Sequence, residues 1–349
     1  MSFFRENIID MSGYVPGEQP KDEEFIKLNT NENPYSCSPK VKAGIGRVLQ
    51  VGLQKYPDPL ASEFRERAGE LLGVDPDWIL CGNGSDDILT IVTRALVNPG
   101  QHIRFPQPSY VLYKTLADIQ GAQCHVVDYE SDWSLGEEFT KHCDKLRLAY
   151  LANPNSPSGT VLLPDDVARI AAALPCPLLV DEAYADFAET NCLKLVEQNE
   201  KVMVSRTLSK SYALAGLRFG YLVAQPQMIA ELAKVKDSYN CDALSIAGAT
   251  AALNDQDWFT ETRSAILATR ARLIEALRAL GFNCVDSQAN FVWCYHPGHE
   301  SLKLYEQLKA GGILVRYMNY PQCGDGLRIT VGTDQQVEAL LELLKTSVD

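Results

Sequence analysis

The stretch Val204-Ser-Arg-Thr-Leu-Ser-Lys-Ser-Tyr-Ala-Leu-Ala-Gly-Leu-Arg-Phe-Gly220 decides how the rest of the chain is interpreted. The apolar run that ends at Val204 predicts a buried strand, and it leads into a hydroxyl-rich loop with one lysine, Lys210. A lysine that attacks a carbonyl must lose its proton near neutral pH, which partial burial and a neighbouring cation favour. Thr207, Ser209 and Arg218 supply the donors that a phosphate needs. The stretch therefore indicates a phosphorylated aldehyde cofactor, although a solvated loop lysine and a surface arginine would produce the same letters.

The composition of the 349 residues is that of an ordinary globular protein, with 46% hydrophobic and 22% charged residues. The chain is long enough for one large domain and a smaller one. Its formal net charge of -13 argues against a nucleic-acid-binding protein, which would usually present a basic face. No apolar run reaches the roughly 18 residues of a membrane span. We therefore expect neither a nucleic-acid partner nor a membrane.

The cysteine pattern favours reduced thiols in a cytoplasmic protein. The ten cysteines are scattered without a Cys-x-x-Cys pair, and no signal-peptide pattern opens the chain. Cys294, His296 and His299 are the one cluster of metal-ligand type, but they surround a turn and match no common zinc spacing. We expect no metal.

Strands and helices alternate through the first two thirds of the chain, which predicts an α/β fold with a mostly parallel sheet covered by helices. Residues 1–38 are polar and turn-rich and are expected to form an arm that packs on the small domain. Residues 39–245 would form the large domain and residues 246–349 a smaller α+β domain. The boundary would fall inside a long helical stretch predicted over residues 226–280.

Polar residues follow several of the predicted strands, and ligands bind at the carboxyl ends of strands in such sheets. Gly82-Asn-Gly-Ser-Asp86 lies between a strand and a helix and could bind an anion, but it fits an ordinary helix cap equally well. Asp181 ends an apolar strand, where an unpaired carboxylate is costly, so it either pairs with a cation such as a protonated pyridine nitrogen or caps the next segment. Tyr184 could reach the same ring. Asn153 to Gly159 forms a tight polar turn.

Together these motifs resemble the fold type I pyridoxal-phosphate aminotransferases, and among them the histidinol-phosphate aminotransferase family. The resemblance spans nearly the whole chain, and the stretches that carry it are Tyr14-Val-Pro-Gly17, Asn31-Glu-Asn-Pro34, Lys55-Tyr-Pro-Asp58, Gly82 to Asp86, Asp181-Glu-Ala-Tyr184, Thr207 to Lys210 and Leu327 to Gly332.

The resemblance implies a role for each site residue. Lys210 would bind pyridoxal 5'-phosphate covalently, Asp181 would pair with its pyridine nitrogen, and Tyr184 and Asn155 would hold the ring hydroxyl. Many relatives carry a second asparagine where this chain has Ser156, which leaves that hydroxyl contact open. The remaining cofactor contacts would be Ser85, Asp86, Tyr110, Thr207, Ser209, Arg218 and, from the second subunit of a homodimer, Tyr56. The substrate contacts would be Tyr14, Asn33, Arg316 and Arg328.

The implied reaction converts histidinol phosphate and 2-oxoglutarate to imidazole acetol phosphate and glutamate, a step of histidine biosynthesis. Two alternatives keep the cofactor, namely an aromatic amino-acid aminotransferase and a decarboxylase of the threonine-phosphate type. A third is a cofactor-binding regulatory module, but such proteins normally carry a DNA-binding domain for which this acidic chain has no spare residues.

Overall fold

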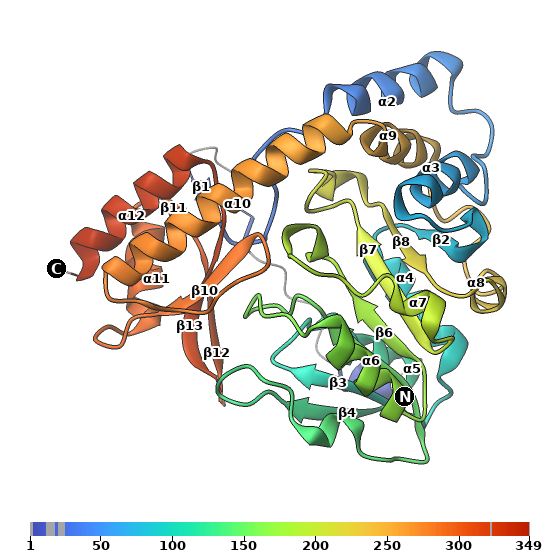
Figure 1. Cartoon of the computed structure of the whole chain (residues 1–349), viewed down its shortest axis with the longest axis horizontal. Coiled ribbons are helices and arrows are strands. Elements are labelled where there is room, and N and C mark those ends of the chain that lie inside the picture. Colours follow the sequence, from blue (N-terminus) through green and yellow to red (C-terminus); the bar gives the residue numbers. More distant parts are fainter. Residues whose placement is uncertain (1–2, 12–17, 20–24, 322, 349) are drawn as a thin grey trace.

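A computed structural model describes residues 3–11, 18–19, 25–321 and 323–348 (Figure 1). Its centre is a seven-stranded sheet in the order β2-β8-β7-β6-β5-β3-β4. The strands β3 to β7 run parallel, and β8 lies antiparallel to both of its neighbours. The bounds are β2 Ile79–Gly82, β3 His102–Gln107, β4 Gln123–Asp128, β5 Leu146–Ala152, β6 Leu178–Asp181, β7 Val202–Thr207 and β8 Gly220–Val223. The predicted α/β class with a mostly parallel sheet is confirmed.

Helices cover both faces of this sheet because its central strands bury side chains on both sides. On β6, Leu178 and Val180 face one core while Leu179 faces the other, and all three are fully buried. The same alternation runs along β5 and β7. The helices of this part are α2 Pro39–Val51, α3 Ser62–Leu72, α4 Ser85–Leu96, α5 Leu112–Gln120, α6 Pro164–Ala173, α7 Leu195–Gln198, α8 Pro226–Leu232 and α9 Ala243–Leu253.

A second, antiparallel sheet lies at the other end of the molecule, and the long helix α10 (Gln256–Ala279) runs toward it (Figure 1). Its order is β12-β13-β10-β9, and a parallel pair, β1 with β11, lies beside it. One apolar core joins these strands to α10, α11 and α12. The bounds are β1 Ile26–Lys27, β9 Asn283–Cys284, β10 Phe291–Tyr295, α11 Ser301–Ala310, β11 Ile313–Leu314, β12 Arg316–Tyr320, β13 Gly324–Thr330 and α12 Asp334–Val348.

The prediction of one helical stretch over residues 226–280 is wrong. The structure has three helices there, α8, α9 and α10, separated by residues 233–242 and by Asn254 and Asp255. The carboxylate of Asp242 accepts hydrogen bonds from the backbone N–H groups of Leu244 and Ser245, so it caps a new helix instead of continuing the previous one.

The N-terminal helix α1 (Glu6–Ile9) lies against the large sheet's helices, where Asn7 Nδ2 donates to the carbonyl of Asp118 in α5. No helix in the described part of the chain is both long and apolar enough to cross a lipid bilayer.

Candidate active site

The parallel strands bring the predicted cofactor residues together at one edge of the large sheet. Asp181 ends β6, the loop after β7 carries Lys210, and α4 begins just after β2. Nine of the predicted residues line one cavity, namely Ser85, Asp86, Tyr110, Asp181, Tyr184, Thr207, Ser209, Lys210 and Arg218. Ser156, from the loop after β5, lines it as well.

The start of α4 lies beside Arg218, which pairs with Asp86 of that helix. Gly84 precedes the helix with a φ of 82°, and no side chain caps the free N–H groups there. Arg218 Nη1 donates to Ser209 Oγ at 3.3 Å, and Nη2 pairs with Asp86 Oδ2 at 3.2 Å. Thr207 Oγ1 donates to Ser209 Oγ at 3.0 Å. A helix N-terminus, two hydroxyls and a guanidinium suit a phosphate.

Two glycines make this close approach possible. A Cβ on Gly84 would lie 2.6 Å from Arg218 Nη2, and a Cβ on Gly220 would lie 2.5 Å from the backbone nitrogen of Ser85. Both positions therefore require the absence of a side chain, and only glycine adopts the φ of Gly84 without strain.

Asp181 lines the same cavity, with only 5% of its surface exposed. Its carboxylate accepts hydrogen bonds from Tyr113 Oη at 2.9 Å, from Ala183 N at 3.2 Å and from Ser205 Oγ at 3.3 Å. Burial nevertheless raises its pKa to about 6, and the negative charge of Asp86 adds to the effect. A buried carboxylate of this kind is stabilised by a cation placed in the cavity.

Lys210 lines the cavity as well. Its Nζ donates to the carbonyl oxygen of Thr30 at 3.2 Å and lies 5.9 Å from the centre of the Tyr184 ring. The Tyr184 hydroxyl accepts a hydrogen bond from Asn31 Nδ2 at 2.9 Å, and Tyr110 Oη donates to Asp86 Oδ1 at 2.9 Å. Burial raises the pKa of Tyr110 far above its ordinary value, so its hydroxyl stays protonated.

This set of groups fits pyridoxal phosphate. The surface around Arg218 suits its phosphate, the buried Asp181 suits a protonated ring nitrogen, and the amine of Lys210 lies on the same cavity as both.

A wider cavity, which also reaches Lys210 and Tyr110, extends toward the small sheet and is lined by Arg316 and Arg328. The two arginines are cross-strand partners on β12 and β13. Arg328 Nη1 donates to Ser156 Oγ at 3.0 Å and Nη2 to the carbonyl of Asn29 at 2.9 Å. Two cations therefore face the space next to Lys210.

Four predicted site residues are not among those that line these two cavities. Asn33 Nδ2 donates hydrogen bonds to the backbone carbonyls of Lys210 and Ser211, at 3.0 Å and 3.1 Å. Asn33 therefore holds the backbone of the lysine loop. Asn155 Nδ2 bonds to Pro108 O and to Ser158 Oγ, both at 3.1 Å. Tyr56 is 80% exposed and stacks on Tyr239 with ring centres 4.4 Å apart. Tyr14 lies outside the described residues.

Sequence reasoning missed Asn31, Tyr113 and Ser205, which contact Tyr184 and Asp181. Ser205 follows the buried Val204 on β7, and the period of a strand could have placed it beside Asp181. Nothing in the sequence connects Tyr113 with Asp181, because 68 residues separate them.

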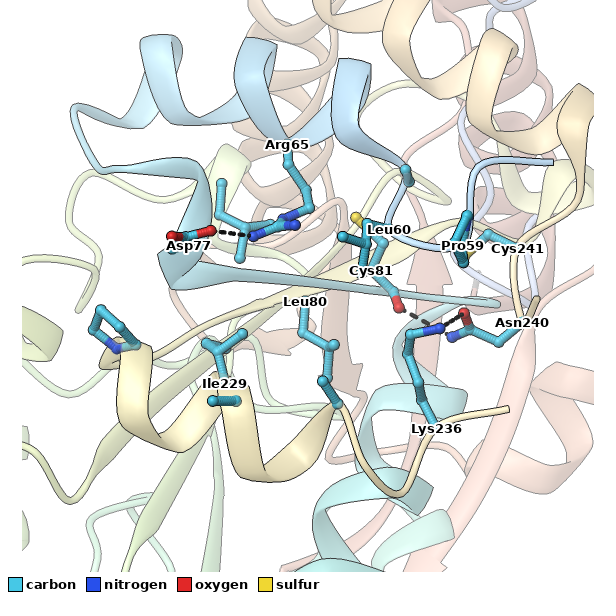
Figure 2. A pocket seen from close by; sticks show the side chains of 15 residues that line it. Pro59, Leu60, Arg65, Asp77, Leu80, Cys81, Ile229, Lys236, Asn240 and Cys241 are labelled. Atoms are coloured by element: carbon cyan, nitrogen blue, oxygen red, sulfur yellow. Dashed lines mark hydrogen bonds and ion pairs between the residues drawn. The ribbon is translucent and has the colours of Figure 1, made fainter. Parts of the chain in front are cut away.

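Figure 2 shows a separate cavity of about 410 Å³ between α3, β2 and α8. Asn240, at its edge, donates to the carbonyl of Cys81 at 3.0 Å and to Asp87 at 2.9 Å, and so supports the loop that precedes α4. Burial raises the pKa of the Cys81 thiol, and it raises that of Cys241 to about 12. Both thiols are therefore protonated and poor nucleophiles.

Three ligand-type side chains, His102, His125 and Cys143, lie within 4.8 Å of one another near the amino ends of β3 and β4. Arg104 Nη2 donates to His125 Nδ1 at 3.0 Å, which puts the proton of neutral His125 on Nε2. The positive charge of Arg104 repels a metal cation, and its hydrogen bond occupies the lone pair of His125 Nδ1 that would otherwise bind the metal.

Comparison with known proteins identifies the family of this chain. The family model described as aminotransferase class I and II matches residues 23–344. The histidinol-phosphate aminotransferase of Rhodopirellula baltica is 51% identical over 99% of this chain and 96% of its own length. The histidinol-phosphate aminotransferase 1 of a Nostoc species is 44% identical over 99% and 98%. The crystal structure of histidinol-phosphate aminotransferase from Sinorhizobium meliloti, in complex with pyridoxal-5'-phosphate, covers 100% of this chain and 98% of its own with a TM-score of 0.90. At 24% identity, that likeness concerns the fold.

The chain therefore belongs to the class I and II aminotransferases and has their fold type I architecture. Within that family, the chain is similar over nearly its full length to histidinol-phosphate aminotransferases. The predicted resemblance to that group is therefore confirmed as well.

Proposed function

We propose that the protein transfers an amino group from histidinol phosphate to 2-oxoglutarate, giving imidazole acetol phosphate and glutamate in histidine biosynthesis. Pyridoxal 5'-phosphate is its cofactor in this proposal. The observation that carries it is identity of 51% and 44%, over nearly full length, to proteins of that name. The aromatic aminotransferase and the decarboxylase are not favoured, because those relatives share neither name.

Five side chains of the cavity have a stated role in this proposal, namely Asp181, Thr207, Ser209, Lys210 and Arg218. Bound pyridoxal phosphate supplies an electron sink for the carbanion that forms at the substrate Cα. Lys210 would hold the cofactor through its amine, and the same amine would accept the proton from the substrate Cα. Asp181 holds a proton at the ring nitrogen, while Arg218, Ser209, Thr207 and the start of α4 bind the phosphate. Tyr184 and Ser156 border the same space.

Arg316 and Arg328 serve the substrates in this proposal. Both substrates carry anions, a phosphate on one and carboxylates on the other, so the same two cations suit each in turn. Arg328 already donates hydrogen bonds of 3.0 Å and 2.9 Å to a hydroxyl and a carbonyl. An anion would accept hydrogen bonds of similar length from the same guanidinium.

Steady-state kinetics test the substrate. We expect kcat/KM for histidinol phosphate to exceed that for histidinol by roughly 100-fold or more, because a substrate without the phosphate loses its charge-assisted hydrogen bonds to these arginines. Arg316→Gln and Arg328→Gln should reduce that preference. The control is Arg278→Gln, which removes an arginine that is half exposed and pairs with Asp286. A better rate with phenylalanine or tyrosine, carbon dioxide release from threonine phosphate, or no effect of the phosphate would contradict the proposed substrate.

We also propose that the active unit is a homodimer in the cytoplasm. Six exposed large apolar side chains come from the end of α2, the loop after it and the segment before α9, namely Leu49, Val51, Leu53, Tyr56, Leu60 and Tyr239. Exposed apolar groups in such number favour burial against another protein surface, and a second copy of this chain would bring Tyr56 toward a neighbouring site. All ten cysteines are free thiols, as expected in a reducing compartment.

A further inference from the structure

Tyr113 is a buried tyrosine in the first turn of α5, and none of the roles above uses it. Its side chain is fully buried, and its hydroxyl donates to Asp181 Oδ2 at 2.9 Å. The other two donors to Asp181, Ala183 N and Ser205 Oγ, bond to Oδ1 at longer distances. Among the described residues, Tyr113 is therefore the one donor to Oδ2. Its hydrogen bond is the shortest that this carboxylate accepts from them.

The ring that carries this hydroxyl packs against two other tyrosines. The Tyr113 ring stacks on Tyr150 with centres 4.7 Å apart and an interplanar angle of 8°, and it meets Tyr110 edge-on at 5.7 Å. Tyr150 is itself held by Thr93 Oγ1 at 2.5 Å and by the carbonyl of Leu89 at 3.2 Å. The hydroxyl of Tyr113 is thus preorganised to donate to the carboxylate.

The hydrogen bond between Tyr113 and Asp181 favours an ionised carboxylate and a protonated hydroxyl. Burial raises the pKa of Asp181, the hydrogen bond from Tyr113 is the largest effect that lowers it, and Asp86 raises it again. Burial and the charge of Asp181 raise the pKa of Tyr113 itself, so its hydroxyl keeps its proton and donates throughout the physiological range.

We infer that Tyr113 is a positioning residue for Asp181: its hydroxyl keeps the carboxylate ionised and holds its orientation toward the ring nitrogen of the cofactor. The inference rests on the proposed function, since it requires pyridoxal phosphate in the cavity. A hydroxyl that only filled the core would leave the protonation of that nitrogen unchanged.

Tyr113→Phe separates the two roles, because it keeps the stacked ring and removes one hydroxyl. The matched control is Tyr150→Phe, which removes the hydroxyl of the other ring in the same stack without contact to Asp181. Each holoenzyme is loaded with cofactor labelled with ¹⁵N at the pyridine nitrogen, and its ¹⁵N NMR signal is recorded together with kcat, KM and the denaturation midpoint.

For Tyr113→Phe we expect the nitrogen signal to shift toward the unprotonated form and kcat to fall roughly 10- to 100-fold, with KM within a few-fold. Tyr150→Phe should lose comparable stability but keep the wild-type signal and kcat. If Tyr113→Phe does not fold, 4-aminophenylalanine at position 113 keeps the ring and supplies a weaker donor, and the signal should move toward the unprotonated form.

A wild-type signal and kcat in Tyr113→Phe, equal losses in Tyr150→Phe, or no shift with 4-aminophenylalanine would overturn the inference. Asp181→Asn distinguishes this outcome from failure of the proposed function. If the wild type binds no cofactor, or its protonated-nitrogen signal survives Asp181→Asn, the cofactor assignment and the inference fail together. If both behave as expected, a silent Tyr113→Phe refutes the inference alone.

Discussion

At the scale of single residues, a functional carboxylate costs stability when the cofactor is absent. Burial raises the pKa of Asp181 to about 6 in the folded protein, from an ordinary value of 3.8. The folded state therefore binds this proton more tightly than the unfolded state does. Stability falls as the pH rises between these two values, and the whole cost is present above the higher one.

We accordingly predict that Asp181→Asn stabilises the apoprotein at pH 7.5 by on the order of 2–3 kcal/mol, and that the gain shrinks toward pH 4. The free energy of unfolding from denaturant titration at both pH values checks this. Asp144→Asn, at a carboxylate that is 94% exposed, is the control and should change nothing. In the holoprotein the gain should disappear, because a ring cation then compensates Asp181. An Asp181→Asn apoprotein less stable than the wild type at pH 7.5 would contradict the account.

At the scale of elements, the phosphate surface depends on how closely β8 approaches the start of α4. The Cβ that alanine would add at Gly220 meets only backbone atoms within 3.0 Å, from Ser85, Gly84 and Arg206, and backbone cannot rotate away. The strand and the helix would have to separate, which would move Arg218 away from the helix N-terminus.

Gly220→Ala should therefore lower stability by roughly 1–3 kcal/mol and weaken cofactor binding at least about tenfold. Gly216→Ala is the matched control four residues away, where an added Cβ meets no atom within 4 Å. Denaturation midpoints and the Kd for pyridoxal phosphate, measured by absorbance, give both numbers. Equal affinities in the two variants would show that the close approach is not required.

The sequence was sufficient to predict where the strands that carry Asp181 and Lys210 end. It was not sufficient to predict which groups the site side chains contact. Apolar runs locate β5, β6 and β7, and the rule for parallel sheets then brings Asp181 and Lys210 to one edge. The partners of Asn33 lie 177 and 178 residues away, so no local pattern could show that its amide holds the lysine loop. Strand β12, Arg-Tyr-Met-Asn-Tyr, was missed as a strand of its own because it lacks apolar alternation.

At the scale of the whole molecule, the proposed homodimer makes each site a product of two chains. Mixing Tyr56→Ala with Lys210→Ala should restore up to about a quarter of wild-type activity, because half the random dimers are hybrids and each hybrid has one intact site. Mixing Lys210→Ala with Asp181→Asn is the control. Both changes affect the cavity of one subunit, so neither site of that hybrid is intact. Two results would argue against shared sites. One is that the first mixture regains no activity, and the other is that a protein shown by sedimentation to be monomeric is fully active.

The pairing of β1 with β11 joins the two ends of the chain, since Ile26 lies opposite Ile313. Asn29, Thr30 and Asn31, which follow β1, line the cavity next to Lys210. At about 5–20 residues per second, a ribosome needs roughly 15–60 seconds to travel from one strand to the other. The large sheet can form during that time, but the cavity wall that follows β1 cannot be fixed by pairing with β11 until about the last tenth of the chain is being made. A nascent chain can therefore hold a folded sheet with Lys210 in place and still be unable to turn over substrate until it nears release.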